Sequence, residues 1–195
     1  FFSKKYNQSA IVINFDHSYN HNNIAYEMFY NSGPMATLPM LKNKSNYRSS
    51  LIWSHDPKFI NSLYSLNNNF LSSVVEEHIE KTLGKVINII NKQKFSLSAH
   101  INSSFYNNRI VYVGDAAHSI HPIAGQGWNL GVRDVEDLTN IINQALNLGL
   151  DLGSDFVCKN YHQQRFFDAY SLYNITDKLN SFFMLDEQAF KQVRN

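Results

Sequence analysis

Residues 114–138, which read GDAAHSIHPIAGQGWNLGVRDVEDL, constrain the fold of this chain more than any other segment. They follow an apolar run, residues 110–113, that has the pattern of a buried strand. Gly114 and Asp115 end this strand, and a loop rich in Gly and Pro leads into a helix expected from about Trp128. Glycine lets the backbone approach a ligand closely, and N–H groups at a helix start favour an anionic or electron-rich atom. The segment therefore predicts a cofactor site.

The composition fits a folded domain without a strongly charged surface. Hydrophobic residues make up 44% of the 195 residues, and the formal net charge is +1, so nothing indicates nucleic-acid binding. No run approaches the roughly 18 apolar residues of a membrane span, and no secretory signal is visible. The one cysteine, Cys158, allows no internal disulfide and favours a reducing compartment.

Before the motif, short apolar runs separated by turn residues predict a mostly antiparallel sheet with short helices. Strands are expected over residues 10–16, 24–30, 35–41, 47–53 and 95–101, and helices over 58–66 and 71–83. Gly84 is expected to end the second helix.

The order Gly-Asp-Ala-Ala-His, Pro, Gly-x-Gly-x-Asn, Asp resembles the second FAD-binding motif of the flavoprotein aromatic hydroxylases, the class of para-hydroxybenzoate hydroxylase. The resemblance implies that Asp115 hydrogen-bonds the ribityl chain of FAD and that Pro122 lies near the flavin ring. It also implies that the backbone around Gly127 faces the N1/O2 edge of the flavin, where a helix start stabilises negative charge. The residues assigned to FAD in this way are Gly114, Asp115, Pro122, Gly125, Gln126, Gly127, Trp128 and Asn129. The alternative is an ordinary strand–loop–helix turn that Asp115 only caps.

Other segments resemble the ubiquinone-biosynthesis hydroxylases, which are FAD-dependent monooxygenases that hydroxylate a polyprenylated benzene ring. The segments that carry this resemblance are residues 10–12, 25–29, 33–40, 51–53, 161–168, 176–179 and 182–183. The resemblance implies an α/β fold with an α+β substrate domain. Residues 1–103 would hold the substrate-domain portion, with its mostly antiparallel sheet and short helices. Residues 104–195 would hold the last strand and helices of the FAD-binding domain.

One part of the family pattern is missing from this sequence. Such enzymes begin with a strand–GxGxxG–helix unit that binds the pyrophosphate of FAD, and no GxGxxG follows an early strand here. The one Gly-x-Gly, residues 125–127, belongs to the later motif. We therefore expect an incomplete FAD-dependent monooxygenase fold, the C-terminal part only, which binds FAD poorly alone. The missing segment would lie upstream on the same chain or on a companion chain.

The resemblance also implies a reaction. NAD(P)H reduces FAD, O2 is the co-substrate, and a flavin C4a-hydroperoxide hydroxylates a polyprenylated phenol. Because the flavin carries the chemistry, no side chain is assigned as catalytic. Other ubiquinone-biosynthesis proteins are possible partners, with a cytoplasmic or peripheral inner-membrane location. Two alternatives remain open, namely a non-catalytic split-gene remnant or assembly subunit, and a sibling hydroxylase for another aromatic substrate.

Pro39, Met40, Trp53 and His121 are the candidates for the substrate pocket. The resemblance places the region of Pro39 and Met40 at the pocket, but core packing would explain the same residues. Trp53 could line a pocket for an aromatic ring or belong to the sheet core, which is the commoner position of such residues.

Several polar residues near the motif are given structural roles. His118 and His121 form an H-x-x-H pair, but no further carboxylate or cysteine is spaced to complete a metal site, so no metal is expected. His118 is expected to fix the loop. Tyr161, Arg165 and Asp168 share one helical face at i, i+4 and i+7 and are expected to dock the C-terminal helix rather than act in catalysis.

Overall fold

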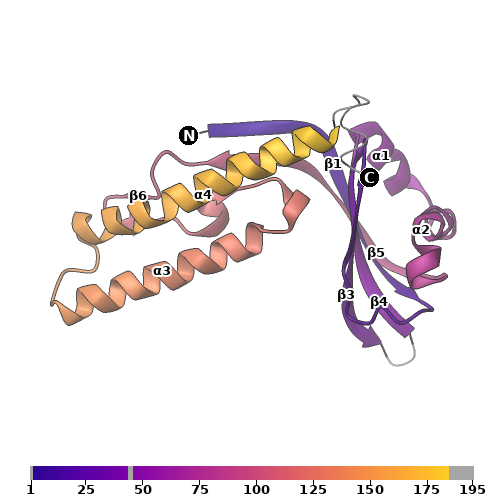
Figure 1. Ribbon diagram of the computed structural model, residues 1–195, viewed down its shortest axis with the longest axis horizontal. Helices are drawn as coiled ribbons and strands as arrows, with labels where there is room; N and C mark the ends of the chain where they lie inside the picture. The colour runs from indigo at the N-terminus through magenta and orange to yellow at the C-terminus, as the bar shows by residue number, and fades with distance from the viewer. Residues whose placement is uncertain (1, 44–45, 185–195) are drawn as a thin grey trace. The chain divides into compact units, whose positions relative to one another are not determined.

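The computed structural model describes residues 2–43 and 46–184, which form two compact units (Figure 1). Tyr6–Leu97 forms most of the first, which we call the sheet unit. Ser98–Phe182 and the residues up to Lys5 form the second, which we call the motif unit. Residues 185–195, which the sequence assigns to the end of the FAD-binding domain, lie outside the described residues.

The sheet unit is built on five strands whose order in the sheet is β2-β3-β4-β1-β5. The strands are β1 (Phe2–His17), β2 (Tyr26–Tyr30), β3 (Gly33–Asn43), β4 (Asn46–His55) and β5 (Val86–Ile101). Neighbouring pairs from β2 to β1 are antiparallel, with Ile13 opposite Leu51 and Met35 opposite Trp53. The antiparallel sheet predicted from the sequence is confirmed.

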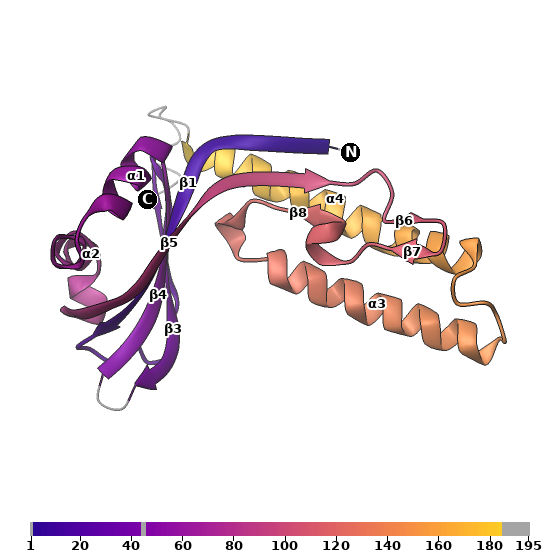
Figure 2. The ribbon, with the colours of Figure 1, turned by 180° about the vertical axis from the view of Figure 1, so that it is seen from behind.

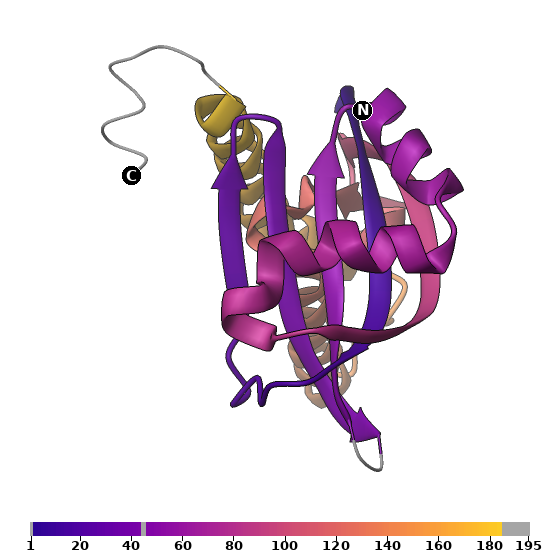
Figure 3. The ribbon, with the colours of Figure 1, turned by 90° about the vertical axis from the view of Figure 1, so that its right-hand side faces the viewer.

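Two helices cover one face of this sheet (Figure 3). Helix α1 (Pro57–Ser65) begins where the Asp56 side chain accepts a hydrogen bond from the Lys58 N–H at 2.8 Å. Helix α2 (Asn68–Leu83) ends at Gly84, whose φ of 73° is readily adopted only by glycine. Both predicted helices are thus confirmed. Alternate residues of the strands and one stripe of each helix form the core, including Ile11, Ile13, Phe15, Leu51, Ile60, Leu71, Val75 and Ile79.

Strands β1 and β5 are much longer than expected. Each has 16 residues, and Figure 2 shows β5 as one continuous curved strand. The prediction missed residues 86–94 because most side chains there are polar or exposed, which hides the alternation that marks a half-buried strand.

The motif unit has two long helices and several short elements. The elements are β6 (Tyr106–Asn107), β7 (Ile110–Val111), the 3₁₀ turn η1 (Gly114–Ala116), β8 (His118–Ser119), the 3₁₀ turn η2 (Pro122–Ala124), α3 (Gly127–Asn147) and α4 (Asp155–Met184). The end of β5 pairs antiparallel with β8. The helix predicted from about Trp128 is confirmed as α3. Within the described residues, no helix has the length and apolar character needed to span a membrane.

The buried strand predicted over residues 110–113 is wrong. Only Ile110 and Val111 form a strand, paired with β6 in a hairpin, and Ile110 is 61% exposed. Tyr112 and Val113 pack against the core of the motif unit without entering a ladder. An apolar run becomes a central strand only where neighbouring strands pair with it, and among the described residues β7 pairs only with β6.

Candidate functional site

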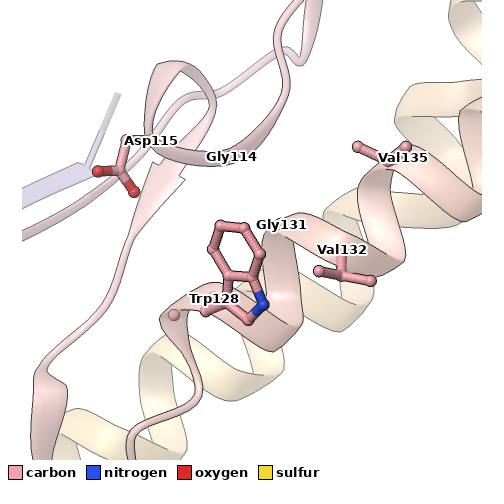
Figure 4. A pocket seen from close by; sticks show the side chains of 7 residues that line it. Gly114, Asp115, Trp128, Gly131, Val132 and Val135 are labelled. Carbon is pink, nitrogen blue, oxygen red and sulfur yellow. The ribbon is translucent and has the colours of Figure 1, made fainter. Parts of the chain in front are cut away.

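A cavity of about 520 Å³ opens between the turn η1 and the start of α3 (Figure 4). Its lining residues are Gly114, Asp115, Gly127, Trp128, Gly131, Val132 and Val135. The volume lies within the range of small-molecule and cofactor sites. The first two residues come from the turn and the other five from successive turns of α3. Two ends of one continuous motif thus form the opposite walls of a site.

Glycines keep the backbone of this site accessible. Gly114 has a φ of 58°, in the left-handed region that favours glycine. A Cβ atom placed on Gly114, on Gly127 or on Gly125 in the loop would have no neighbouring protein atom within 4 Å. The space beside these glycines is therefore open to a ligand rather than filled by protein.

The start of α3 has backbone N–H groups that receive no side-chain cap. Gln126 precedes the helix but gives it no side-chain cap. Its Oε1 atom instead accepts a hydrogen bond from Asn129 Nδ2 at 3.2 Å. The first turn of a helix carries partial positive charge, so this end of the cavity favours an electron-rich or anionic atom.

Asp115 presents a carboxylate on the opposite wall. The residue is exposed, and no side chain or N–H group in the described part of the chain donates to its carboxylate. Its main-chain oxygen accepts a hydrogen bond from His100 Nε2 at 3.1 Å, which anchors the turn. The carboxylate is thus available to accept hydrogen bonds from hydroxyl groups of a ligand.

Behind the turn lies the fully buried carboxylate of Asp134 in α3. Its Oδ2 atom accepts hydrogen bonds from the Gly114 N–H at 2.9 Å and from His118 Nε2 at 2.7 Å. Its Oδ1 atom accepts one from Arg165 Nε at 2.7 Å. Burial acts to raise the pKa of Asp134, but these donors outweigh burial and lower it, so the group is a carboxylate at neutral pH.

Arg165 extends this network along α4. Its Nη1 atom donates to Asp137 Oδ2 at 3.0 Å, and its Nη2 atom lies 2.8 Å from Asp168 Oδ2. Arg133 pairs with Asp168 in turn, at 2.9 Å. On the same face of α4, the Tyr161 hydroxyl donates to the Tyr112 carbonyl at 2.9 Å. Tyr161, Arg165 and Asp168 thus hold α4 against the rest of the motif unit.

The two histidines of the H-x-x-H pair are both buried. His118 joins β8 to Asp134, as described above. His121 Nδ1 accepts a hydrogen bond from the Ile123 N–H at 3.2 Å and so caps η2. Among the residues that the structure describes, no group of three or more His, Cys, Asp or Glu side chains could hold a metal ion.

Burial lowers the pKa of His121 to about 4 from its ordinary value of 6.5. As the pH falls, His121 therefore takes up a proton in the unfolded state before it does so in the folded state. The stability that this pKa difference contributes to the folded state above pH 6.5 is lost between pH 6.5 and about 4. We expect the loss to be about 3 kcal/mol, measured as the free energy of unfolding against pH. The variant His121→Asn keeps an acceptor for the Ile123 N–H but cannot titrate, so it should lose distinctly less stability over this range. Equal losses in the two proteins would contradict the prediction.

Four residues assigned to FAD from the sequence line the cavity, namely Gly114, Asp115, Gly127 and Trp128. The other four, Pro122, Gly125, Gln126 and Asn129, lie in the adjoining loop or on the first turn of α3 and are not among its lining residues. Sequence reasoning missed Gly131, Val132 and Val135. They follow Trp128 by three, four and seven residues, which places them on the same face of the helix as Trp128. This helical spacing could have predicted them from the sequence.

The four substrate-pocket candidates occupy different environments. Trp53 is a core residue of the sheet unit, 4% exposed, with its ring against Phe59 and His78. Pro39 and Met40 lie on β3, opposite Ser49 and Arg48 of β4. His121 belongs to the motif unit. Contact of these residues with a substrate stays a prediction.

Most of this chain matches a known protein family. Residues 2–166 match the model of a protein family described as an FAD-binding domain. The chain belongs to this FAD-binding family. The resemblance stated from the motif is therefore confirmed, whereas the contacts of the assigned residues with FAD stay a prediction.

Individual proteins that resemble this chain include two hydroxylases. A ubiquinone hydroxylase, UbiL, from Rhodospirillum rubrum is 35% identical over 181 residues, which cover 93% of this chain and 41% of that protein. A 3-demethoxyubiquinol 3-hydroxylase from Escherichia coli is 30% identical over 191 residues, which cover 98% of this chain and 48% of that protein. The chain thus spans less than half the length of these relatives.

Solved structures confirm the fold. PqsL, a probable FAD-dependent monooxygenase from Pseudomonas aeruginosa, matches 99% of this chain with 53% of its own length, at a TM-score of 0.75 and 17% identity. The p-nitrophenol 4-monooxygenase PnpA from Pseudomonas putida matches all of this chain with 48% of its own, at a TM-score of 0.69 and 14% identity. The predicted partial FAD-dependent monooxygenase fold is therefore confirmed.

The residues at the cavity fit a flavin nucleotide. The Asp115 carboxylate can accept hydrogen bonds from the hydroxyls of a ribityl chain, and the start of α3 suits the electron-rich edge of a flavin ring. Gly114 and Gly127 leave room for a ligand to approach the backbone. Trp128, Val132 and Val135 add an apolar wall.

Proposed function

We propose that the protein containing this chain is an FAD-dependent monooxygenase that hydroxylates a polyprenylated aromatic ring in ubiquinone biosynthesis. The observation that carries the proposal is the cavity that is lined both by Asp115 and by the uncapped start of α3. Membership of the FAD-binding family supports the cofactor, and the 35% identity to a ubiquinone hydroxylase supports the substrate class.

The overall reaction balances with O2 and NAD(P)H as co-substrates. NAD(P)H and a proton supply two electrons and two protons in all. One oxygen atom of O2 enters a ring C–H bond as a hydroxyl group, and the other leaves as water. FAD, when bound, supplies the redox chemistry that links these half-reactions.

The residues of this chain bind and orient rather than react. Asp115 would hold the ribityl chain, and the N–H groups at the start of α3 would stabilise negative charge on the nearby flavin edge. The apolar side chains of Trp128, Val132 and Val135 would exclude water from one side of the site.

We further propose that other cofactor contacts come from sequence outside these 195 residues. The chain covers 41% of one relative and 48% of another, and no GxGxxG follows an early strand. A dinucleotide needs a pyrophosphate site, which that motif supplies at the start of a helix. The tests below therefore use the complete protein.

The experiment is to purify the complete protein, record its visible absorption, and incubate it with NAD(P)H, O2 and a polyprenylated phenol. We expect bound FAD and a product heavier by one oxygen atom in mass spectrometry. The absence of bound FAD would overturn the proposal in favour of a non-catalytic remnant or assembly subunit. FAD with hydroxylation only of unprenylated aromatics would indicate a sibling hydroxylase.

Replacing Asp115 with Ala is expected to weaken FAD binding on the order of tenfold, because hydrogen bonds to a charged acceptor are lost. Fluorescence titration of the apoprotein with FAD measures the change. The melting temperature of the apoprotein should stay the same, since the carboxylate is exposed and has no partner in the described residues. The control is Asp155→Ala, which removes an exposed carboxylate that pairs with Lys159 outside the cavity lining. Unchanged FAD affinity in the Asp115 variant would contradict the assignment.

A further inference from the structure

The buried carboxylate of Asp134 connects the cofactor turn to the C-terminal helix. Its two oxygen atoms serve different segments. Oδ2 accepts from the Gly114 N–H and from His118 Nε2, both in the motif segment before α3, whereas Oδ1 accepts from Arg165 in α4. Asp134 itself does not line the cavity, so it acts on the site through its neighbours.

We propose that Asp134 is a positioning residue for FAD, which fixes the Gly114–Asp115 turn against α4 through a divided set of hydrogen bonds. The inference rests on the proposed function, because it takes FAD to be the ligand of the cavity. According to this inference, α4 influences the affinity for FAD although it does not line the cavity.

The conformation of the turn depends on this bond. Gly114 has a φ of 58°, and its carbonyl accepts from the Ala117 N–H at 2.8 Å. The Asp134 bond fixes the other side of the same residue, the N–H group, at 2.9 Å. Because hydrogen bonds hold both the N–H group and the carbonyl group of Gly114, the direction in which the Asp115 side chain leaves the backbone is fixed. Loss of the Asp134 bond frees the Gly114 peptide to rotate and with it the carboxylate that would hold the ribityl chain.

The bond from His118 gives the turn a second support. A carboxylate only accepts hydrogen bonds, so His118 Nε2 must carry the proton in this 2.7 Å contact. His118 lies in β8, which pairs with Ile101 at the end of β5. The carboxylate thus holds both ends of the short segment between Gly114 and His118.

An amide cannot replace this carboxylate. The partners of both oxygen atoms are donors, namely Gly114 and His118 on one side and Arg165 on the other. An Asn side chain has one acceptor atom and one donor group, so in either orientation its NH2 group faces a donor. Either the turn or α4 therefore loses its contact.

The test compares Asp134→Asn with Asp137→Asn in the complete protein. Asp137 is the matched control, because it also accepts from Arg165, at 3.0 Å, but bonds neither Gly114 nor His118. We expect the dissociation constant of FAD to rise on the order of tenfold or more in the first variant and to change less than about twofold in the second. The visible absorption bands of the bound flavin should shift only in the first, because only there does the environment of the flavin change. Equal affinities and spectra in the two variants would overturn the inference.

A second pair keeps the test decisive if Asp134→Asn does not fold. His118→Gln retains an N–H donor for Asp134, whereas His118→Leu removes it at similar volume. We expect His118→Gln to restore most of the FAD affinity that His118→Leu loses, with both melting temperatures recorded. Wild-type affinity in His118→Leu would overturn the inference. If the wild-type protein itself binds no FAD, the proposed function fails instead, so the two failures are distinguishable.

Discussion

Replacing Arg165 with Met should lower the free energy of unfolding by roughly 3–5 kcal/mol, the range observed when one partner of a buried ion pair is removed. Arg165 is 3% exposed and reaches Asp134, Asp137 and Asp168. The variant leaves the fully buried carboxylate of Asp134 without its Nε donor, and methionine fills the space without supplying a positive charge. Urea unfolding of the variant and the wild type measures the difference.

The control for this prediction is Arg133→Met. Arg133 pairs with Asp168 alone among the described residues, and its side chain is 42% exposed. Exposed ion pairs contribute about 0–1 kcal/mol, so this variant should lose no more than that. A loss in Arg165→Met as small as that in the control would mean that the buried network adds little to stability.

The second large effect is expected at Gly33, where β3 begins after the turn that follows β2. Its φ is 135°, and a Cβ atom there would lie 2.4 Å from the backbone oxygen of Ser54. Because that oxygen belongs to the neighbouring strand β4, relief requires the sheet itself to shift. We expect Gly33→Ala to cost about 3 kcal/mol or more in the free energy of unfolding, from backbone strain and overpacking together.

Gly149→Ala separates these two contributions. Gly149 has a φ of 66°, but a Cβ atom there would meet nothing within 4 Å. The variant therefore carries only the strain of a left-handed alanine, about 1–2 kcal/mol. If both alanine variants lose the same amount in thermal or urea unfolding, the close approach at Ser54 is not the cause.

The parts of the site that the sequence predicts best are those made by one short segment. Gly114, Asp115, Gly127 and Trp128 lie within 15 residues of one another, and local turn chemistry places them together. The helical face that continues the cavity wall through Val135 follows from the same periodicity once the helix is known. Turn residues and alternation likewise predict the hairpins of the sheet unit.

Contacts between distant segments are not encoded in any local pattern. The sequence indicates a polar cluster on α4, but the partner of Arg165 at Asp134 lies 31 residues away and depends on how α3 and α4 pack. The incorrect strand over residues 110–113 has a related cause. Apolar character shows that a segment is suited to burial, whereas the number of residues in a ladder is decided by the strands beside it.

The beginning of β1 has a consequence for the order of folding during synthesis. Within the motif unit, Lys4 pairs with Asp177 at 2.6 Å and the Phe2 ring lies beside that of Tyr170, so residues near the start contact partners 168 and 173 positions later. A ribosome that adds 5–20 residues per second needs roughly 10–30 s to make that stretch. During this interval the α4 residues that contact Phe2 and Lys4 have not yet been synthesised. The motif unit therefore completes its fold only after α4 has left the exit tunnel.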